Sequence, residues 1–320
     1  MNKTILDRRE IRAARTAKPE HNPWQPIGQD WEIERGVHSA LRETLTVYLT
    51  GAECPFTCLF CDLWQHTLPR KTPVGALPKQ LAIALENAAT IPENAAIKLY
   101  NASNFFDPHA VPIEDFDKLA NLCDEFVRIT VESHPKFLGE RCEAFHEMLF
   151  GRLEVALGLE TIHPAVFPRL KDGMTLSDFD CGVEWAKSRG IGVRAFVLVG
   201  LPWVPAVEFP TWAARSTARA FEAGADRVSL IPLRTDDGIL RTMREKNKIE
   251  PVTLGHLEDA LAASFEVIKS ETSGIVEADM WDVEALIVCQ HCAADRIERL
   301  KHANQKQYLE SEVPCHCTTT

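Results

Sequence analysis

From residue 44 onward, short apolar runs alternate with longer stretches in which apolar residues recur every three or four positions. The runs predict six strands, at residues 45–50, 96–100, 126–131, 153–159, 193–199 and 227–231. The periodic stretches predict helices at 78–89, at 113–125, through Cys142 to Leu149, at 175–190, at 209–223 and at 254–269. Near-continuous apolar strands that are each followed by a helix favour a parallel sheet in an α/β fold.

Both ends of the chain depart from this alternation of strands and helices, so the sequence predicts that the chain has three parts. Residues 1–42 are polar and mixed in charge, and we expect a short helix in this N-terminal extension. Residues 43–270 hold the six strand–helix units, which suit a partly open barrel or a flat doubly wound sheet. Within them, residues 234–248 are highly charged without an apolar face and are interpreted as a loop. Residues 271–320 form a cysteine-rich C-terminal extension with a basic helix at 296–306.

Composition narrows the classes of protein. A chain of 320 residues with 45% hydrophobic content is long enough to bury a sizeable core. No apolar run approaches the roughly 20 residues of a membrane span, so we expect no membrane segment. The ten cysteines are grouped in spacings typical of metal ligands, which favours a reducing, cytoplasmic setting over disulfides. The net charge of −11 argues against a broad nucleic-acid-binding surface, but it does not exclude a local basic groove that binds nucleic acid.

A cysteine loop follows the first predicted strand. Cys54, Cys58 and Cys61 have the spacing C-x3-C-x2-C, which lets three thiols converge on one face of a tight loop. Three ligands are one short of a closed zinc site or a fully ligated iron–sulfur cube, so one metal position is left open for chemistry. The alternatives are a zinc-binding loop or three unrelated thiols.

The loop, with Phe60 directly before the third cysteine, resembles the cluster loop of the radical S-adenosylmethionine (SAM) enzymes. The resemblance implies that the three thiolates hold a [4Fe–4S] cluster and that SAM chelates the fourth iron. One electron from an external reductant of the flavodoxin or ferredoxin type would release methionine and a 5′-deoxyadenosyl radical. It also implies a partial (β/α)6 barrel, with the site at the carboxyl ends of the strands.

Four later turns are similar to SAM-contacting elements, most closely those of the Elongator-3 and archaeosine-synthase branch (Elp3/MiaB/NifB-like). The stretch after the second strand departs from the usual Gly-Gly-Glu-like motif, and His134 stands where arginine is usual, so we interpret His134 as structural. For the other positions, an ordinary capped turn is the alternative. The SAM-binding residues that the resemblance implies are Phe60, Asn101, Ser103, Asn104, Glu132, Ser133, Glu160 and Gly200.

A second group of cysteines lies in the tail: Cys289 and Cys292, then Cys315 and Cys317. C-x2-C paired with C-x-C supplies four thiolates, a complete tetrahedral set that by itself favours structural zinc. Beside a radical SAM barrel, such cysteines more often hold an auxiliary iron–sulfur cluster, and we prefer the cluster. Three further cysteines fall on predicted helices and are interpreted as core residues: Cys123, Cys142 and Cys181.

The sequence therefore predicts a radical SAM enzyme that abstracts hydrogen from its substrate. The Elongator-3-type and archaeosine-type resemblance makes a tRNA or a nucleobase the first candidate. The acidic charge keeps a small metabolite or a peptide open as the alternative within the enzyme class. Outside that class, the chain could be a zinc-stabilised interaction protein with a decayed barrel.

Overall fold

A computed structural model describes residues 7–36, 40–170, 173–236, 238–271 and 274–315, without the side chains of 269–271. The chain divides into two compact units. The loop unit comprises Arg15–Gly158 and Asp172–Arg194, and it contains the cysteine loop. The tail unit comprises Met1–Ala14, Leu159–Lys171 and Ala195–Thr320.

The strands of the loop unit follow one another in chain order. They are β1 (Gly28–Arg35), β2 (Leu41–Tyr48), β3 (Ala96–Tyr100), β4 (Arg128–Ser133) and β5 (Arg152–Glu160), the last continuing past Gly158. β1 runs antiparallel to β2, and the later pairs are parallel. Because parallel neighbours end at the same edge of a sheet, the turns after β2, β3 and β4 meet there.

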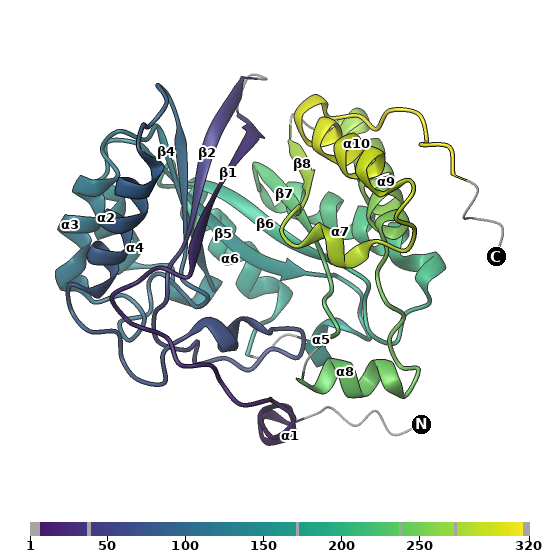
Figure 1. Ribbon diagram of the computed structural model, residues 1–320, viewed down its shortest axis with the longest axis horizontal. Helices are drawn as coiled ribbons and strands as arrows, with labels where there is room; N and C mark the ends of the chain where they lie inside the picture. The colour runs from purple at the N-terminus through teal and green to yellow at the C-terminus, as the bar shows by residue number, and fades with distance from the viewer. Residues whose placement is uncertain (1–6, 37–39, 171–172, 237, 272–273, 316–320) are drawn as a thin grey trace. The chain divides into compact units, whose positions relative to one another are not determined.

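Helices of the loop unit cover its sheet. They are α2 (Ala76–Ala88), α3 (Phe116–Leu122), α4 (Glu140–Met148) and α6 (Leu176–Lys187). Figure 1 shows α2, α3 and α4 side by side next to the strands, and four phenylalanines pack beneath and between them: Phe105, Phe106, Phe116 and Phe145. The predicted capping box is confirmed, because Thr175 and Asp178 exchange side-chain-to-backbone hydrogen bonds at the start of α6. Short 3-10 turns lie at Leu63–His66, Ile113–Asp115 and Pro135–Phe137.

Buried charges tie β1 to the rest of the loop unit. Glu34 on β1 accepts hydrogen bonds from Lys98 and from Arg194, each at 3.0 Å, and also contacts Arg128. Arg194 donates on to Glu154 at 3.0 Å. Buried charges are tolerated when they are paired in this way. A polar segment thus joins the sheet through ion pairs instead of an apolar face.

The tail unit contains the remaining elements. They are α1 (Arg8–Ala13), α5 (Phe167–Leu170), β6 (Gly192–Val199, in this unit from Ala195), a 3-10 turn (Ala206–Glu208), α7 (Phe209–Ala223), β7 (Arg227–Pro232), α8 (Gly238–Glu245), α9 (Leu254–Glu271), β8 (Ile275–Ala278), a 3-10 turn (Val283–Leu286) and α10 (Ala293–Lys306). β7 and β8 are parallel. α7 packs on α9, and α10 lies beside β8 and α9 (Figure 1).

Most predicted elements are confirmed, including the six strands, the helix in the N-terminal extension and the helix in the tail. The loop predicted at 234–248 is wrong, because α8 lies within it and buries Leu240 and Met243. Leu240 and Met243 lie three positions apart on one face of an amphipathic helix, but the helix has only eight residues, too few for the pattern to repeat. β1 and β8 were not predicted from sequence. Within the described ranges, no helix combines the length and apolar character that crossing a membrane requires.

Candidate functional site

The three cysteines of the loop lie just beyond β2. Cys54, Cys58 and Cys61 are each half-buried, and the Cys61 backbone N–H donates to the Cys58 carbonyl at 3.3 Å. Burial, followed by the nearby charges of Cys58, Asp62 and Cys54, raises the pKa of Cys61 well above its ordinary value. The three thiols are therefore within electrostatic reach of one another. A positively charged metal centre would favour the thiolate forms that this environment disfavours.

The N-terminal extension helps to fix this loop. Glu53, directly before Cys54, accepts from Arg15 at 2.7 Å and from Lys18 at 2.6 Å. Lys18 also donates to the hydroxyl of Thr67 at 2.9 Å, and Thr67 follows the three cysteines in the sequence. These contacts lower the pKa of Glu53 despite its burial, so the carboxylate stays ionised. No pattern in the sequence indicated a role for this segment in the site.

Residues after β3 and β4 reach the cysteine loop. The Asn104 side-chain amide donates to Cys54 Sγ at 3.1 Å, and its oxygen accepts from the His134 backbone N–H at 2.6 Å. The His134 ring stacks on Phe56, between the first two cysteines, with ring centroids 4.1 Å apart. Asn104 thus touches a proposed cluster ligand, and its predicted contact with SAM stays a prediction. The structural role expected of His134 stays a prediction, although its ring packs on the cysteine loop.

Glu132, at the end of β4, is cradled by the turn that follows β3. Successive backbone N–H groups of Asn101, Ala102 and Ser103 donate to its carboxylate. Ala102 has a φ of +54°, which lets the three N–H groups converge as an anion-binding nest. Burial outweighs these donors and raises the pKa of Glu132 to about 7.

Several buried polar atoms beside this nest lack a hydrogen-bond partner among the described residues. They are Oε1 of Glu132, Oγ of Ser103, and both Oδ1 and Nδ2 of Asn101. An unsatisfied buried polar atom costs about 1–3 kcal/mol, so four in one place favour a site for a polar ligand. All three residues were predicted as SAM contacts. Ser133, also predicted, is buried, and its hydroxyl donates to the His134 carbonyl at 3.3 Å.

The other three predicted SAM contacts, Phe60, Glu160 and Gly200, lie in different parts of the chain and each has its own neighbours. Phe60 is half-buried within the cysteine loop. In the tail unit, Glu160 is buried and has a φ of +64°, an uncommon backbone conformation for a residue other than glycine. Gly200 has a φ of +93°, and a Cβ placed on it would lie 2.1 Å from Val252 Cγ2. The close approach expected at Gly200 is therefore made by a side chain of the protein, and the roles of these three residues stay predictions.

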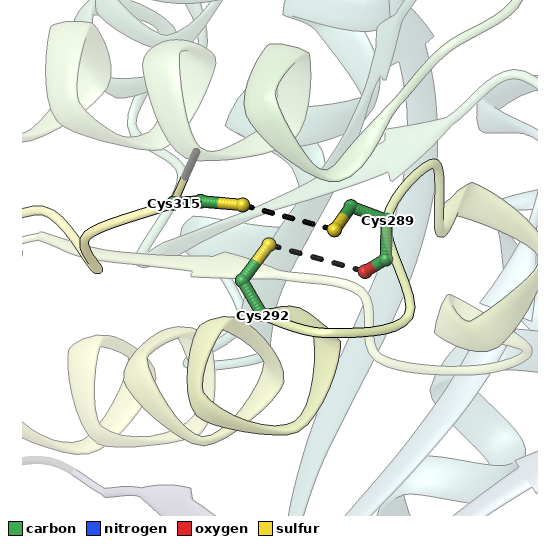
Figure 2. A group of neighbouring side chains, drawn as sticks. All are labelled: Cys289, Cys292 and Cys315. Atoms are coloured by element: carbon green, nitrogen blue, oxygen red, sulfur yellow. Dashed lines mark hydrogen bonds between the residues drawn. The ribbon is translucent and has the colours of Figure 1, made fainter. Parts of the chain in front are cut away.

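The tail brings three thiols together. Sγ atoms of Cys289, Cys292 and Cys315 all lie within 4.8 Å of one another, and those of Cys289 and Cys315 are 3.7 Å apart (Figure 2). Backbone N–H groups of Cys292 and His291 lower the pKa of Cys289. The group could hold a metal ion. Cys317 lies outside the described residues.

The remaining predictions for cysteine are partly wrong. Cys123 and Cys142 are buried, as expected of core residues. Cys181 is exposed on α6. It occupies the solvent side of that helix, whereas Phe179, Val183 and Ala186 face inward.

Known proteins relate to the chain chiefly through structure. No protein-family model matches it. An uncharacterized protein of Methanocaldococcus jannaschii is 22% identical over 298 residues, covering 86% of this chain and 80% of that protein. Elp3 from the archaeon Methanocaldococcus infernus superposes with a TM-score of 0.52 at 14% identity, over 71% of this chain and 58% of the Elp3 chain. Methylornithine synthase also gives 0.52, at 16% identity, over 80% and 68%.

This chain spans less than two thirds of the Elp3 chain, so the likeness concerns the shared part. At these identities the likeness establishes architecture alone. The predicted partial (β/α)6 barrel is therefore confirmed, and the chain shares its fold with Elp3 and methylornithine synthase.

Proposed function

We propose that the protein is a radical SAM enzyme whose catalytic [4Fe–4S] cluster is bound by Cys54, Cys58 and Cys61. One observation carries the proposal: the cysteine loop adjoins buried polar atoms that have no partner among the described residues. Asn104 links the two features, because it follows Ser103 directly in the sequence and donates to Cys54. A metal centre and a polar ligand would thus be neighbours.

The residues fit the cofactor pair by their chemistry. Three half-buried thiols leave one iron of a cube without a protein ligand. SAM carries an amino group, a carboxylate and ribose hydroxyls, and the turns offer acceptors and donors on Asn101, Ser103 and Glu132 that no described residue bonds. When bound, the cluster and SAM supply a 5′-deoxyadenosyl radical that abstracts hydrogen from the substrate.

The protein's own contribution is to bind, orient and stabilise charge. Glu132, held by three backbone N–H groups, accepts from a hydroxyl or amino donor of the ligand. The pKa of the Glu132 carboxyl lies near 7 without a ligand. A hydrogen-bond donor on the ligand would lower this pKa and so favour the ionised carboxylate. The Asn104 amide donates to Cys54 and stabilises negative charge on that thiolate. Glu53, Arg15 and Lys18 keep the loop in place from the other side.

Anaerobic reconstitution tests the activity directly. The full chain, supplied with iron, sulfide, a strong reductant and SAM, is expected to release 5′-deoxyadenosine that mass spectrometry detects. A Cys58→Ala variant should not do so, whereas Cys181→Ser, at an exposed cysteine, should behave as the wild type. A chain that binds no iron and yields no 5′-deoxyadenosine would instead be the zinc-stabilised interaction protein with a decayed barrel.

For the substrate, we propose a tRNA or a nucleobase, on the strength of the Elongator-3-type and archaeosine-type motifs at Glu132 and Glu160. The net charge of −11 favours the alternative, a small metabolite or a peptide. Binding of bulk tRNA across a range of salt concentrations separates the two. A tRNA substrate predicts an affinity that falls steeply with salt, because phosphate contacts release counterions. An absence of binding at low salt would favour the metabolite or peptide.

A soluble one-electron donor of the flavodoxin or ferredoxin type is the partner that this chemistry needs, in a reducing cytoplasmic setting. The tail supplies a second metal site, with an auxiliary [4Fe–4S] cluster or zinc as its occupant.

A further inference from the structure

We propose that Tyr48 and Tyr100 bind the substrate, as the uncharged ring of a nucleobase, on one face of the sheet in the loop unit. The inference deepens the proposed function and rests on it, because it takes Glu132, beside Tyr100, as the SAM contact. Of the three tyrosines in the chain, these two lie on neighbouring strands, Tyr48 on β2 and Tyr100 on β3. Strand register, solvent access and the charges beneath the two rings support the proposal.

One face of this sheet carries the buried ion pairs, and we call it the inner face. Three side chains on neighbouring strands donate to glutamates there: Thr46 to Glu32 at 2.9 Å, Lys98 to Glu34 at 3.0 Å and Thr130 to Glu154 at 3.0 Å. Side chains two positions further along a strand lie on the same face of the sheet. Tyr48, Tyr100 and Glu132 follow these three donors by two positions, so they lie on the inner face as well.

Strand register places these three side chains in one row. Tyr48 pairs with Tyr100 across β2 and β3, and the register of β3 and β4 brings Tyr100 next to Glu132. The row continues to Gly28 on β1 and to Ala156 on β5, which are both small. Adjacent strands lie about 4.8 Å apart, so neighbours in a row can contact the same ligand. Between β1 and β5, the two phenols and the carboxylate are the long side chains of this row.

Solvent reaches this row but not the row beneath it. Tyr48, Tyr100 and Glu132 are each half-buried. Two positions earlier on the same strands, Lys98 and Thr130 are only 6% and 0% exposed. The inner face is therefore closed at the level of the ion pairs and accessible at the level of the tyrosines. The ion pairs form a floor, and the two rings lie above it.

The floor is balanced in charge. It consists of three cations and three anions that pair with one another: Lys98, Arg128, Arg194, Glu32, Glu34 and Glu154. Lys98 Nζ lies 5.7 Å from the centroid of the Tyr100 ring, which places this ring directly over the floor. Burial raises the pKa of Tyr100 well above its ordinary value, so the phenol keeps its proton at neutral pH. A paired floor beneath neutral phenols favours an uncharged ligand over an ionic one.

Two aromatic rings side by side suit a planar ligand. A nucleobase is planar and uncharged, and proteins bind single bases by stacking them on aromatic side chains. A phenol hydroxyl can also donate to and accept from the edge of a base. Because Glu132 is next in the row, a base held by the tyrosines would lie beside SAM, as hydrogen abstraction requires. Recognition inside the sheet needs no basic outer surface, in keeping with the net charge of −11.

Fluorine NMR tests the proposal, because the chain has only three tyrosines. The full chain is labelled with 3-fluorotyrosine, reconstituted anaerobically with iron and sulfide, and saturated with SAM. Single Tyr→Phe variants assign the three signals. Adenosine, guanosine, cytidine and uridine are then added separately, and at least one should shift the signals of Tyr48 and Tyr100 by more than their linewidths. Tyr308, which is 49% exposed in the tail unit, is the internal control and should not shift.

Two results of the titration would overturn the proposal: no shift at Tyr48 and Tyr100 with any of the four nucleosides, or an equal shift at Tyr308. 5′-Deoxyadenosine measured in the same sample separates this failure from failure of the proposed function. Unmoved signals in a sample that cleaves SAM overturn the nucleobase site alone. A sample that yields no 5′-deoxyadenosine contradicts the proposed function, and its nucleoside shifts still decide whether the tyrosines bind a base.

A matched pair of variants measures what one ring contributes. Tyr100→Leu removes a stacking surface, so the Kd of the nucleoside that shifts the signals should rise by about fivefold or more. Tyr308→Leu should leave this Kd unchanged. Isothermal titration of the unlabelled proteins measures both values. Equal Kd values in Tyr100→Leu and the wild type would exclude Tyr100 from the site.

Discussion

The two cysteine groups share a C-x2-C step, Cys58 to Cys61 and Cys289 to Cys292, yet their surroundings differ. Around the loop cysteines, Glu132, Ser103 and Asn101 carry buried polar atoms without a partner among the described residues. In the tail, Asn304 on α10 accepts from the Ala278 N–H of β8 and donates to the Ala278 carbonyl, each at 2.8 Å. The loop group is therefore arranged to receive a ligand, whereas α10 is tied to β8 by hydrogen bonds that need none.

The largest effect should come from breaking the loop group. Cys58→Ala removes a cluster ligand, and 5′-deoxyadenosine formation should fall by more than about 100-fold, since even residues behind a metal ligand contribute 10- to 100-fold. Product is measured by mass spectrometry after anaerobic reconstitution, with Cys181→Ser as the matched control. Activity close to that of the wild type would remove Cys58 from the site.

Glu132→Gln should weaken SAM binding by about 10- to 100-fold, because it removes an ionised hydrogen-bond acceptor. Isothermal titration of the reconstituted protein measures the change. The nearby Ser133→Ala, at a hydroxyl bonded to the protein's own backbone, is the control and should change the affinity little. Unchanged affinity in Glu132→Gln would show that the carboxylate does not contact SAM.

The same Glu132 variant has a signature in stability. In the folded protein the pKa of Glu132 is raised from 4.5 to about 7, so folding favours the protonated carboxyl. Its contribution to stability is full below about pH 4.5 and is lost as the pH rises through 7. Without ligand, the free energy of unfolding of the wild type should therefore fall between pH 5 and pH 8 more than that of Glu132→Gln. Denaturant titrations measure this free energy at each pH. If it changed with pH equally in the two proteins, burial would not raise the pKa of Glu132.

The smallest effect concerns tuning of the loop group. Asn104→Ala removes the N–H that faces Cys54 Sγ, and the reduction potential of the cluster should become more negative by on the order of 50 mV. Potentiometric titration followed by electron paramagnetic resonance measures it. Asn121→Ala, at an exposed asparagine on α3, is the matched control. An unchanged potential in Asn104→Ala would mean that the contact only orders the loop.

The sequence predicted the elements whose side chains are apolar and periodic. β2 to β7 are nearly continuous apolar runs, so they could be placed without a structure. β1 could not, because its buried residue is Glu34, whose ion pairs join residues up to 160 positions apart. α8 was missed because its amphipathic pattern covers only eight residues within a highly charged stretch.

Within the site, motif order predicted roles for Cys54, Cys58, Cys61 and Glu132, which lie at or just beyond strand ends. The contact between Asn104 and Cys54 joins residues 50 positions apart, and no local pattern in the sequence predicts it. The approach of Cys289 and Cys315, whose Sγ atoms are 3.7 Å apart, likewise joins residues 26 positions apart, which spacing along the chain does not determine. Long-range contacts, rather than residue types, were the missing information.

The most direct test of the account is whether SAM binds the cluster of the loop group. The full chain is reduced anaerobically, and SAM labelled with nitrogen-15 at its amino group is added. Electron–nuclear double resonance should show a nitrogen coupling to the cluster, because three cysteines leave one iron for the amino acid end of SAM. A reduced cluster whose spectrum is unchanged when SAM is added, and which shows no nitrogen coupling, would contradict the account.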